Sequence, residues 1–160
     1  MLDLLPEHYS AKRLFPVGRL DYFSEGLLLL TDDGELANQL THPRHHLPKY
    51  YEVVLRGELS PQGKELMEKG MRLAEGEKLA PVRVERLGLE ARNEKLLLTL
   101  YQGINRQIRR MFRDLDMTIL SLKRIGQGPL KLGALRKGEC RELSLAELKE
   151  LREALALRAD

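Results

Sequence analysis

Two charged side chains stand close together in a glycine-bounded segment near the start of the chain. Arg19 and Asp21 lie between Gly18 and Gly26, directly before the apolar run Leu27–Leu30. A carboxylate that a buried strand holds in a loop can act as a nucleophile or as a general base. On spacing alone, however, the segment is more typical of a solvated turn with an exposed aspartate.

A second group of charged side chains is predicted to share a helix, Asn105–Leu115. The apolar residues of this segment recur at i, i+3, i+4 and i+7, which predicts one buried face. Arg109 lies at the border of that face, where its guanidinium would point along the surface into a cleft. Between Tyr101 and Arg113 the chain holds four arginines and no acidic residue, which favours phosphate contact over a merely solvated face. The predicted buried face comprises Ile108, Met111, Phe112 and Leu115, and the arginines roughly opposite it are Arg106, Arg110 and Arg113.

Three histidines close together in the sequence raise the question of a metal site. They are His42, His45 and His46, with Pro43 and Pro48 beside them. The prolines break any helix that would give i, i+4 ligand spacing, and no acidic residue or cysteine lies nearby. We therefore predict no metal site here, and a basic loop that faces nucleic acid instead.

The composition limits the class of protein. The chain has 160 residues, of which 42% are hydrophobic and 32% charged, enough for one domain with an ordinary surface. Its longest apolar run is far shorter than the ~20 residues that a membrane helix needs. The start, MLDLLPEH, does not resemble a secretory signal, so we expect a cytoplasmic protein with no membrane contact. The single cysteine, Cys140, excludes an internal disulfide and is predicted to be a small buried residue. The net charge of +3 does not by itself establish nucleic-acid binding.

Strands and helices must hold these residues in place, and the pattern predicts both. Short apolar runs mix with amphipathic segments without strict alternation, which favours an α+β fold over a doubly wound parallel sheet. The predicted strands are Leu27–Thr31, Tyr50–Leu55, Pro81–Leu87, Lys95–Tyr101 and Thr118–Ile125. Besides the arginine helix, we predict helices capped by Asp32 with Glu35, by Ser60 before Pro61, and by Ser144 with Glu147. The last of these helices is predicted to carry Leu145, Leu148, Leu151 and Leu155 on one side.

Three motifs, in order, resemble those of one enzyme family. The run GRLDYFSEGLLLLTDDGELANQLTHP, from Gly18, is similar to the signature of the RsuA/RluB/RluE/RluF family of ribosomal RNA pseudouridine synthases. KYYEV, at Lys49–Val53, resembles the K-x-Y-x-V segment of that family, and NRQIRRM, at Asn105–Met111, resembles its arginine-bearing segment. With the closing run GPLKLGALRKGECREL, at Gly128–Leu143, the resemblance covers nearly the whole chain.

The resemblance implies a role for each matching residue. Asp21 corresponds to the catalytic aspartate, Tyr51 to the aromatic residue that stacks on the target base, and Arg109 to the basic partner of the aspartate. Arg19 corresponds to a residue that, in related synthases, enters the stack left by the flipped nucleotide. The further residues of these motifs that we expect to bind RNA are Lys49, Arg106, Gln107, Arg110 and Arg113.

The reaction that the resemblance implies explains these residue types. Pseudouridine formation breaks the bond between ribose C1′ and uracil N1, rotates the base and rejoins it through C5, so no cofactor and no metal is required. Asp21 would act as a nucleophile or as a general base, and the residues leave both roles open. Arg109 at hydrogen-bond distance would favour the ionised carboxylate and fix its direction. Stacking on Tyr51 would help to offset the unstacking of the target base, a cost on the order of a few kcal/mol.

The resemblance also implies a fold, a domain and partners. We expect an α+β pseudouridine synthase fold, in which a mixed, mainly antiparallel sheet is flanked by helices around a central cleft. Residues 1–160 would form the catalytic domain without its first strand, and without the S4-type RNA-binding domain that usually precedes it. The expected partner of a monomeric enzyme is ribosomal RNA, with 23S RNA or a precursor particle favoured. Two other functions stay open: a synthase that acts on transfer or messenger RNA, and an rRNA-binding assembly factor that has lost catalysis.

Overall fold

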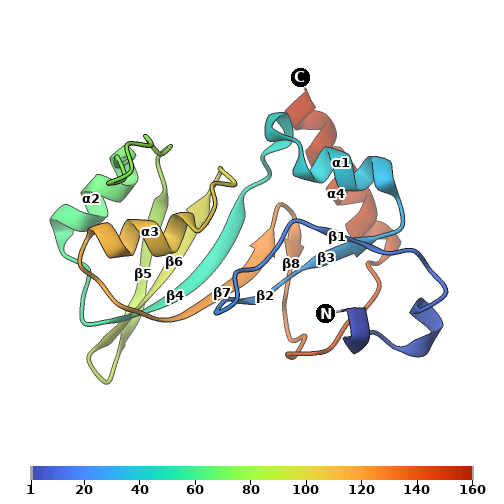
Figure 1. The fold of residues 1–160 in the computed structure, drawn as a ribbon, viewed down its shortest axis with the longest axis horizontal. Helices are drawn as coiled ribbons and strands as arrows, with labels where there is room; N and C mark the ends of the chain where they lie inside the picture. The colour runs from blue at the N-terminus through green and yellow to red at the C-terminus, as the bar shows by residue number, and fades with distance from the viewer. Residues whose placement is uncertain (1, 160) are drawn as a thin grey trace.

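One mixed sheet of six strands runs through the molecule and joins two lobes (Figure 1). The structure is a computed structural model that describes residues 2–159. Among the described strands of this sheet, β2 and β7 are parallel and the other neighbours are antiparallel. This arrangement confirms the predicted mixed, mainly antiparallel sheet. In spatial order the strands are β2 (Glu25–Gly26), β7 (Ile119–Gln127), β4 (Lys49–Arg56), β6 (Asn93–Leu100) and β5 (Arg83–Glu90), and β8 (Leu130–Lys131) pairs with β7.

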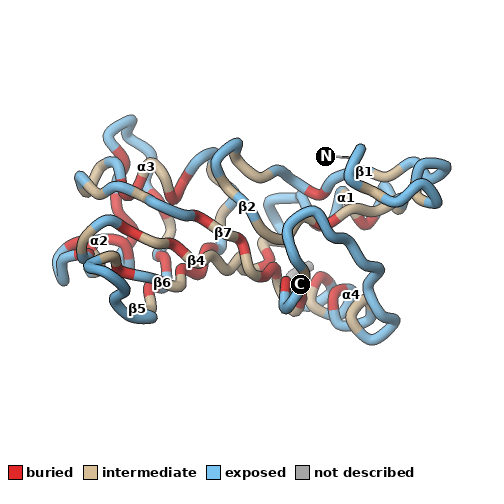
Figure 2. Tube along the Cα trace, turned by 90° about the horizontal axis from the view of Figure 1, so that it is seen from below, coloured by how far each residue is buried: buried red, intermediate tan, exposed pale blue. Residues whose placement is uncertain are grey.

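Two helices cover one face of the sheet toward β5 and form the larger lobe (Figure 1). One of them begins where the sequence predicts, because the Ser60 hydroxyl accepts a hydrogen bond from the Gly63 amide at 3.0 Å. The other buries Ile108, Met111 and Phe112, as its periodicity predicts. Figure 2 shows buried positions recurring along the strands of this lobe. The helices are α2 (Pro61–Lys69) and α3 (Gln107–Asp114), and their core partners include Val53, Leu55, Leu96, Leu98 and Leu122 of the sheet.

The smaller lobe has a core of its own. The antiparallel pair β1 and β3 packs with α1 and α4 around a second buried cluster. The predicted capping box of α4 is confirmed, since Ser144 N donates to Glu147 Oε2 at 2.8 Å and Glu147 N donates to Ser144 Oγ at 3.1 Å. The elements are β1 (Phe15–Val17), β3 (Leu29–Thr31), α1 (Gly34–Thr41) and α4 (Leu145–Ala159), with short 3-10 turns at Leu2–Leu4, Glu7–Tyr9 and Pro43–His45.

Two predictions about the segment before α1 are wrong in detail. The cap of α1 is Asp33 and not Asp32, because the Asp33 carboxylate accepts from the amides two and three residues ahead at 3.0 and 3.1 Å. The strand predicted for Leu27–Thr31 is shorter than predicted, because β3 begins at Leu29. Leu27 N still donates to Arg124 O of β7 at 2.8 Å, whereas Leu29 already pairs with β1.

Two burial predictions are also wrong. Leu145 is 87% exposed, because the first turn of α4 extends beyond the packed part of the helix, where Leu151 and Leu155 are buried. Cys140 is exposed in the loop between β8 and α4. No helix within residues 2–159 combines the length and the apolar character needed to cross a membrane.

Candidate active site

A cleft of about 670 Å³ lies between the two lobes. Its walls come from the loop between β1 and β2, the first part of β4, the loop between β6 and α3, and the end of β7. Three predicted site residues do not line it: Arg109 reaches Asp21 from α3, and Arg110 and Arg113 point elsewhere. The predicted site residues that line it are Arg19, Asp21, Lys49, Tyr51, Arg106 and Gln107.

Asp21 and Arg109 face each other at one side of the cleft. Arg109 Nε lies 3.9 Å from Asp21 Oδ2, which is within ion-pair reach, as expected, but longer than a hydrogen bond. A second contact fixes the guanidinium, because Arg109 Nη2 donates to Ser24 Oγ at 3.1 Å. Both charged side chains are mostly buried, with 17% of Arg109 and 23% of Asp21 exposed. The arginine therefore lies beside the carboxylate without hydrogen-bonding to its oxygens, which remain available to a substrate.

A glycine fixes the loop that carries Asp21 against β7. Gly26 adopts a φ of +117°, and a Cβ at this position would stand 2.1 Å from the backbone oxygen of Arg124. A side chain cannot fit there, so the close approach of β2 to β7 requires glycine. Arg124 then holds the adjoining residue, because its Nε donates to the Leu27 carbonyl at 2.8 Å. The carboxylate is thus positioned by a strand from the far end of the sequence.

Tyr51 and Lys49 lie on the same face of β4, two residues apart, and both line the cleft. Tyr50 points to the opposite face, where its ring lies against Gly126. The expectation that one of the two adjacent tyrosines faces the cleft is confirmed. Tyr51 stands directly opposite Arg124 of β7 in the sheet register, so the two side chains are neighbours on the cleft face.

Sequence reasoning missed two cleft residues on β7, Arg124 and Gln127, which are both only 3% exposed. In a regular strand, side chains three residues apart point to opposite faces. Here the pairing with β4 shifts by one residue between Tyr50 and Tyr51, which leaves Ile125 without a partner on β4 and turns both side chains to the cleft. A signal for Arg124 was present: it follows the buried Leu122 by two residues, which puts an arginine on the buried face of a predicted strand.

Positive charge predominates in the cleft. Among the described residues that line it, Asp21 is the one carboxylate, and none of its cationic side chains forms an ion pair with an acidic residue of the described chain. Burial, together with the positive charge of Arg124, lowers the pKa of the Lys49 ammonium. We refer to the cationic side chains Arg19, Lys49, Arg106 and Arg124 as the cleft cations.

The other arginines of α3 are in a different situation. Arg110 pairs with Glu77 and, at 3.3 Å, with Glu75, while Arg113 Nη1 lies 2.7 Å from Glu75. Asp114, the neighbour of Arg113, completes this network at 2.7 Å. Although the chain from Tyr101 to Arg113 contains no acidic residue, Asp114 follows directly, and the loop after α2 supplies Glu75 and Glu77. Arg110 and Arg113, which we call the outer arginines, are therefore poorer candidates for phosphate contact than the cleft cations.

The start of α3 supplies the remaining predicted residues. Arg106 precedes the helix in a left-handed conformation, with a φ of +51°, and is exposed at the cleft. Gln107 is buried, and its Oε1 has no hydrogen-bond partner within residues 2–159. Arg19 lines the opposite wall and is exposed. These positions suit contact with a long polar ligand that extends from the cleft.

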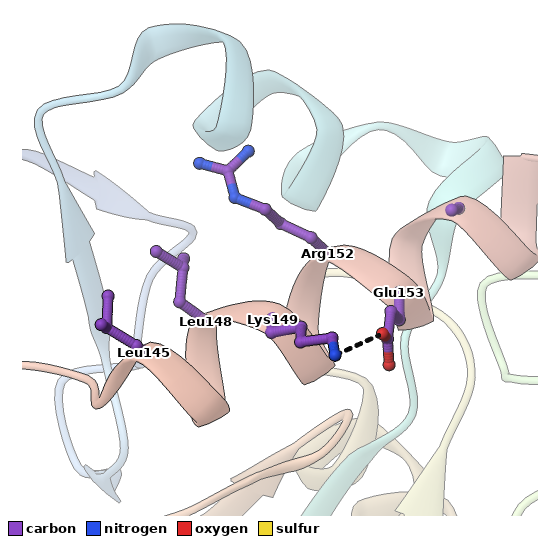
Figure 3. A pocket seen from close by; sticks show the side chains of 6 residues that line it. Leu145, Leu148, Lys149, Arg152 and Glu153 are labelled. Atoms are coloured by element: carbon purple, nitrogen blue, oxygen red, sulfur yellow. Dashed lines mark ion pairs between the residues drawn. The ribbon is translucent and has the colours of Figure 1, made fainter.

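Two further features are the histidine segment, of which Pro43 and His46 line the cleft, and a hollow on α4. The histidine segment holds a local contact, in which His42 Nδ1 accepts from Arg44 N at 3.1 Å, and the part of the chain described contains no group of acidic, histidine or cysteine side chains arranged for a metal. A shallow hollow of about 440 Å³ on α4 is shown in Figure 3. There Lys149 pairs with Glu153 at 3.9 Å, and Arg152 points toward α1, where it meets Asp33 at 3.6 Å.

Comparison with known proteins gives a consistent result. Residues 3–114 match the family model described as RNA pseudouridylate synthase. An uncharacterized RNA pseudouridine synthase of Aquifex aeolicus is 41% identical over 147 residues, which are 92% of this chain and 59% of that protein. Ribosomal large subunit pseudouridine synthase B of Bacillus subtilis is 41% identical over 143 residues, which are 88% of this chain and 58% of that protein. The chain therefore spans less than two thirds of the length of these relatives.

A solved structure supports the fold. The crystal structure of a pseudouridylate synthase matches 93% of this chain and 64% of its own, with a TM-score of 0.84 at 31% sequence identity.

Proposed function

Because the chain belongs to the family of RNA pseudouridylate synthases, we propose that it converts a uridine of ribosomal RNA to pseudouridine with Asp21 as the reacting group. The observation that carries the proposal is the pairing in the cleft of one carboxylate with Arg109, beside the half-buried ring of Tyr51. In this proposal Asp21 acts as the nucleophile or the general base, Arg109 keeps it ionised and oriented, and Tyr51 stacks on the flipped base.

The nature of the cleft supports RNA as the substrate. The cleft cations provide an excess of positive charge over the single carboxylate, which suits a phosphate backbone. Ribosomal RNA is favoured over transfer RNA, and the large-subunit RNA over the small, because the Bacillus subtilis relative is named for the large ribosomal subunit. We also propose that residues 1–160 act as the catalytic domain, that the enzyme is a monomer, and that it works in the cytoplasm, where the substrate would lie.

Substitution of the carboxylate tests this function. With 5-tritiated uridine in ribosomal RNA, Asp21→Asn is expected to lower tritium release by at least about a thousandfold, because the reacting group is removed. RNA affinity should change by less than about threefold, because phosphate contacts supply most of it. Asp32→Asn, which alters an exposed carboxylate outside the cleft, is the matched control and should retain full activity.

Two outcomes would contradict the proposal. Activity of Asp21→Asn within a few-fold of the wild type would show that Asp21 is not the reacting group. RNA binding by a wild-type protein that releases no tritium from any RNA would instead favour an assembly factor without catalysis.

A further inference from the structure

Two cleft cations at the floor of the cleft lack the partners that buried charges normally have. Arg124 is 3% exposed, and although its Nε donates to the Leu27 carbonyl, its Nη2 is buried without a hydrogen-bond partner among residues 2–159. Lys49, on the neighbouring strand, forms no ion pair with a described carboxylate. Buried charges in folded proteins are normally paired, because an unpaired one keeps the full cost of its desolvation.

The two charges are close enough to act together. In the register of β4 with β7, Lys49 lies opposite Gln127, and Tyr51, two residues on, lies opposite Arg124, so the two cations are diagonal neighbours on the cleft face. The positive charge of Arg124 accordingly contributes to the lowered pKa of the Lys49 ammonium. The ammonium also lies near Gly103, since a Cβ at Gly103 would stand 3.6 Å from Lys49 Nζ. Two cations that repel each other in a partly dry site are stabilised by an anion that bridges them.

The irregular pairing of β7 places Gln127 on the same face of the sheet as this pair. If Ile125 were paired regularly, Arg124 and Gln127, three residues apart, would point to opposite faces. The same pairing sets Arg124 opposite Tyr51 and Gln127 opposite Lys49. The cations therefore adjoin the ring on which the target base is proposed to stack. Gln127 Oε1, also buried without a partner in the described chain, lies at the same place.

We propose that Arg124 and Lys49 form a phosphate subsite that holds one backbone phosphate of the nucleotide whose base stacks on Tyr51. This proposal rests on the proposed function. A nucleotide fixed at both its base and its phosphate can present ribose C1′ to Asp21 in one orientation, so the subsite contributes positioning rather than chemistry. Arg124 has a second task, because it also holds Leu27 next to the loop that carries Asp21.

A cycle that combines a protein variant with a modified RNA tests the subsite. The RNA is a stem–loop with a uridine that the wild-type enzyme converts, in which the linkage 5′ or 3′ of that uridine is replaced by a neutral methylphosphonate. Lys49→Met is the main variant, because the Lys49 side chain forms no hydrogen bond or ion pair with residues 2–159, whereas Arg124 variants would lose the contact with Leu27. Lys123→Met is the matched control, since it removes one positive charge from the opposite face of the same sheet.

The expected result is a coupled loss of affinity. For the wild type and for Lys123→Met, one of the two neutral linkages should raise the Kd by about tenfold, as loss of a charged hydrogen bond does. Lys49→Met should bind the unmodified RNA about tenfold more weakly, and the same neutral linkage should then change the Kd by less than about twofold. Its KM should rise with little change in kcat, as expected for a positioning contact.

Independent losses would overturn the proposal. If the neutral linkage and Lys49→Met multiply their effects to about a hundredfold, or if neither linkage affects the wild type, the two cations do not hold a phosphate there. Tritium release by the wild type on the unmodified RNA separates the two proposals. If tritium release is normal but the coupling is absent, the subsite proposal is wrong and the proposed function stands. If the wild type converts no uridine, both proposals are wrong.

Discussion

The cleft cations and the outer arginines are similar side chains in opposite electrostatic settings. Arg110 and Arg113 share the carboxylates of Glu75 and Glu77 on the outer side of α3. The cleft cations have no such partner within the described chain, and one of them, Arg124, is almost fully buried. The outer arginines are neutralised by carboxylates of the protein and need no anionic ligand for charge balance. The cleft cations are not neutralised in this way, so a ligand that binds them is expected to carry negative charge.

Two adjacent arginines of α3 give the largest expected contrast. Arg109→Ala should lower kcat by about a hundredfold or more, because Asp21 loses the charge that orients it. Arg110→Ala, one residue further, should stay within about threefold of the wild type, since it breaks a surface ion pair away from the cleft. Single-turnover tritium release measures both. Equal losses in the two variants would show that the distinction between cleft and outer face has no catalytic meaning.

The close approach of β2 to β7 at Gly26 can be broken sterically. Gly26→Ala should lower the free energy of unfolding by about 3 kcal/mol, because the new Cβ meets the backbone of β7 at a φ that disfavours side chains. Gly76→Ala has a similar φ, +101°, with open space around it, and should cost about 1 kcal/mol. Urea denaturation compares the two. A similar cost at both sites would mean that β2 can move away from β7 without penalty.

Removing an unpaired cation should stabilise the protein, whereas removing a paired one should not. The folded-state pKa of Lys49 is lowered, so burial penalises its charged form at every pH below that value. At pH values between the folded and the unfolded pKa of Lys49, the unfolded chain binds more protons than the folded one. The loss of stability caused by burying the charged lysine therefore decreases as the pH rises above the folded pKa and is absent above the unfolded pKa. Lys49→Met should therefore raise the free energy of unfolding at pH 7, and the gain should shrink in alkaline solution.

Urea denaturation at pH 7 and at about pH 10 measures this change for Lys49→Met, with Arg110→Met as the comparison. The outer variant should be neutral or slightly less stable at both pH values, because it loses an ion pair whose carboxylate, on Glu77, is 45% exposed. A loss of stability in Lys49→Met at pH 7 would indicate that the lysine has a partner in the free protein.

The salt dependence of RNA binding should distinguish the cleft cations from the outer arginines, and the changes in this dependence are the smallest of the expected effects. Arg106→Ala should reduce the slope of log K against log salt by about 0.7 to 0.9, the value for one lost phosphate contact. Arg110→Ala and Arg113→Ala should reduce it by less than half as much, because Glu75 and Glu77 already neutralise them.

The ion pairs between the outer arginines and Glu75 persist in mildly acidic solution. Hydrogen bonds, first of all from Arg113, lower the pKa of the Glu75 carboxyl to about 2, so the pair persists at pH 5. Glu75→Gln with Glu77→Gln should free the outer arginines and strengthen RNA binding by about twofold to fivefold. Binding titrations at several salt concentrations measure these changes. Unchanged affinity in the double variant would place the outer face away from the RNA.

Local signals predicted much of this molecule, and long-range pairing accounts for what they missed. Ser60 and Ser144 cap their helices as predicted, because a cap depends on residues three positions away. Glu77 and Glu75, which pair with Arg110 and Arg113, lie 33 and 38 residues away from them, so the charge pattern of the helix could not reveal these two acids. Arg124 was missed for the same reason, since its place in the cleft depends on how β7 pairs with β4 and β2.

The family motifs located the chemical groups but not their distances. Asp21, Tyr51 and Arg109 were predicted by resemblance to belong to one site, and the structure brings them to the same cleft region. The 3.9 Å separation of Asp21 and Arg109, with Ser24 as the hydrogen-bond partner of the arginine, follows from the loop and helix geometry and has no counterpart in the motifs.

The unpaired residue of β7 gives this strand one residue more than regular pairing with β4 needs. Deleting Ile125 would restore regular alternation and leave Arg124 and Gln127 two residues apart, still on the cleft face opposite Tyr51 and Lys49. The inserted residue thus changes the spacing of the two cleft residues along the sequence without changing which side chains face the cleft. In strands of this kind, an odd spacing between two polar residues on one wall is a mark of such an insertion, and it can be looked for before any coordinates exist.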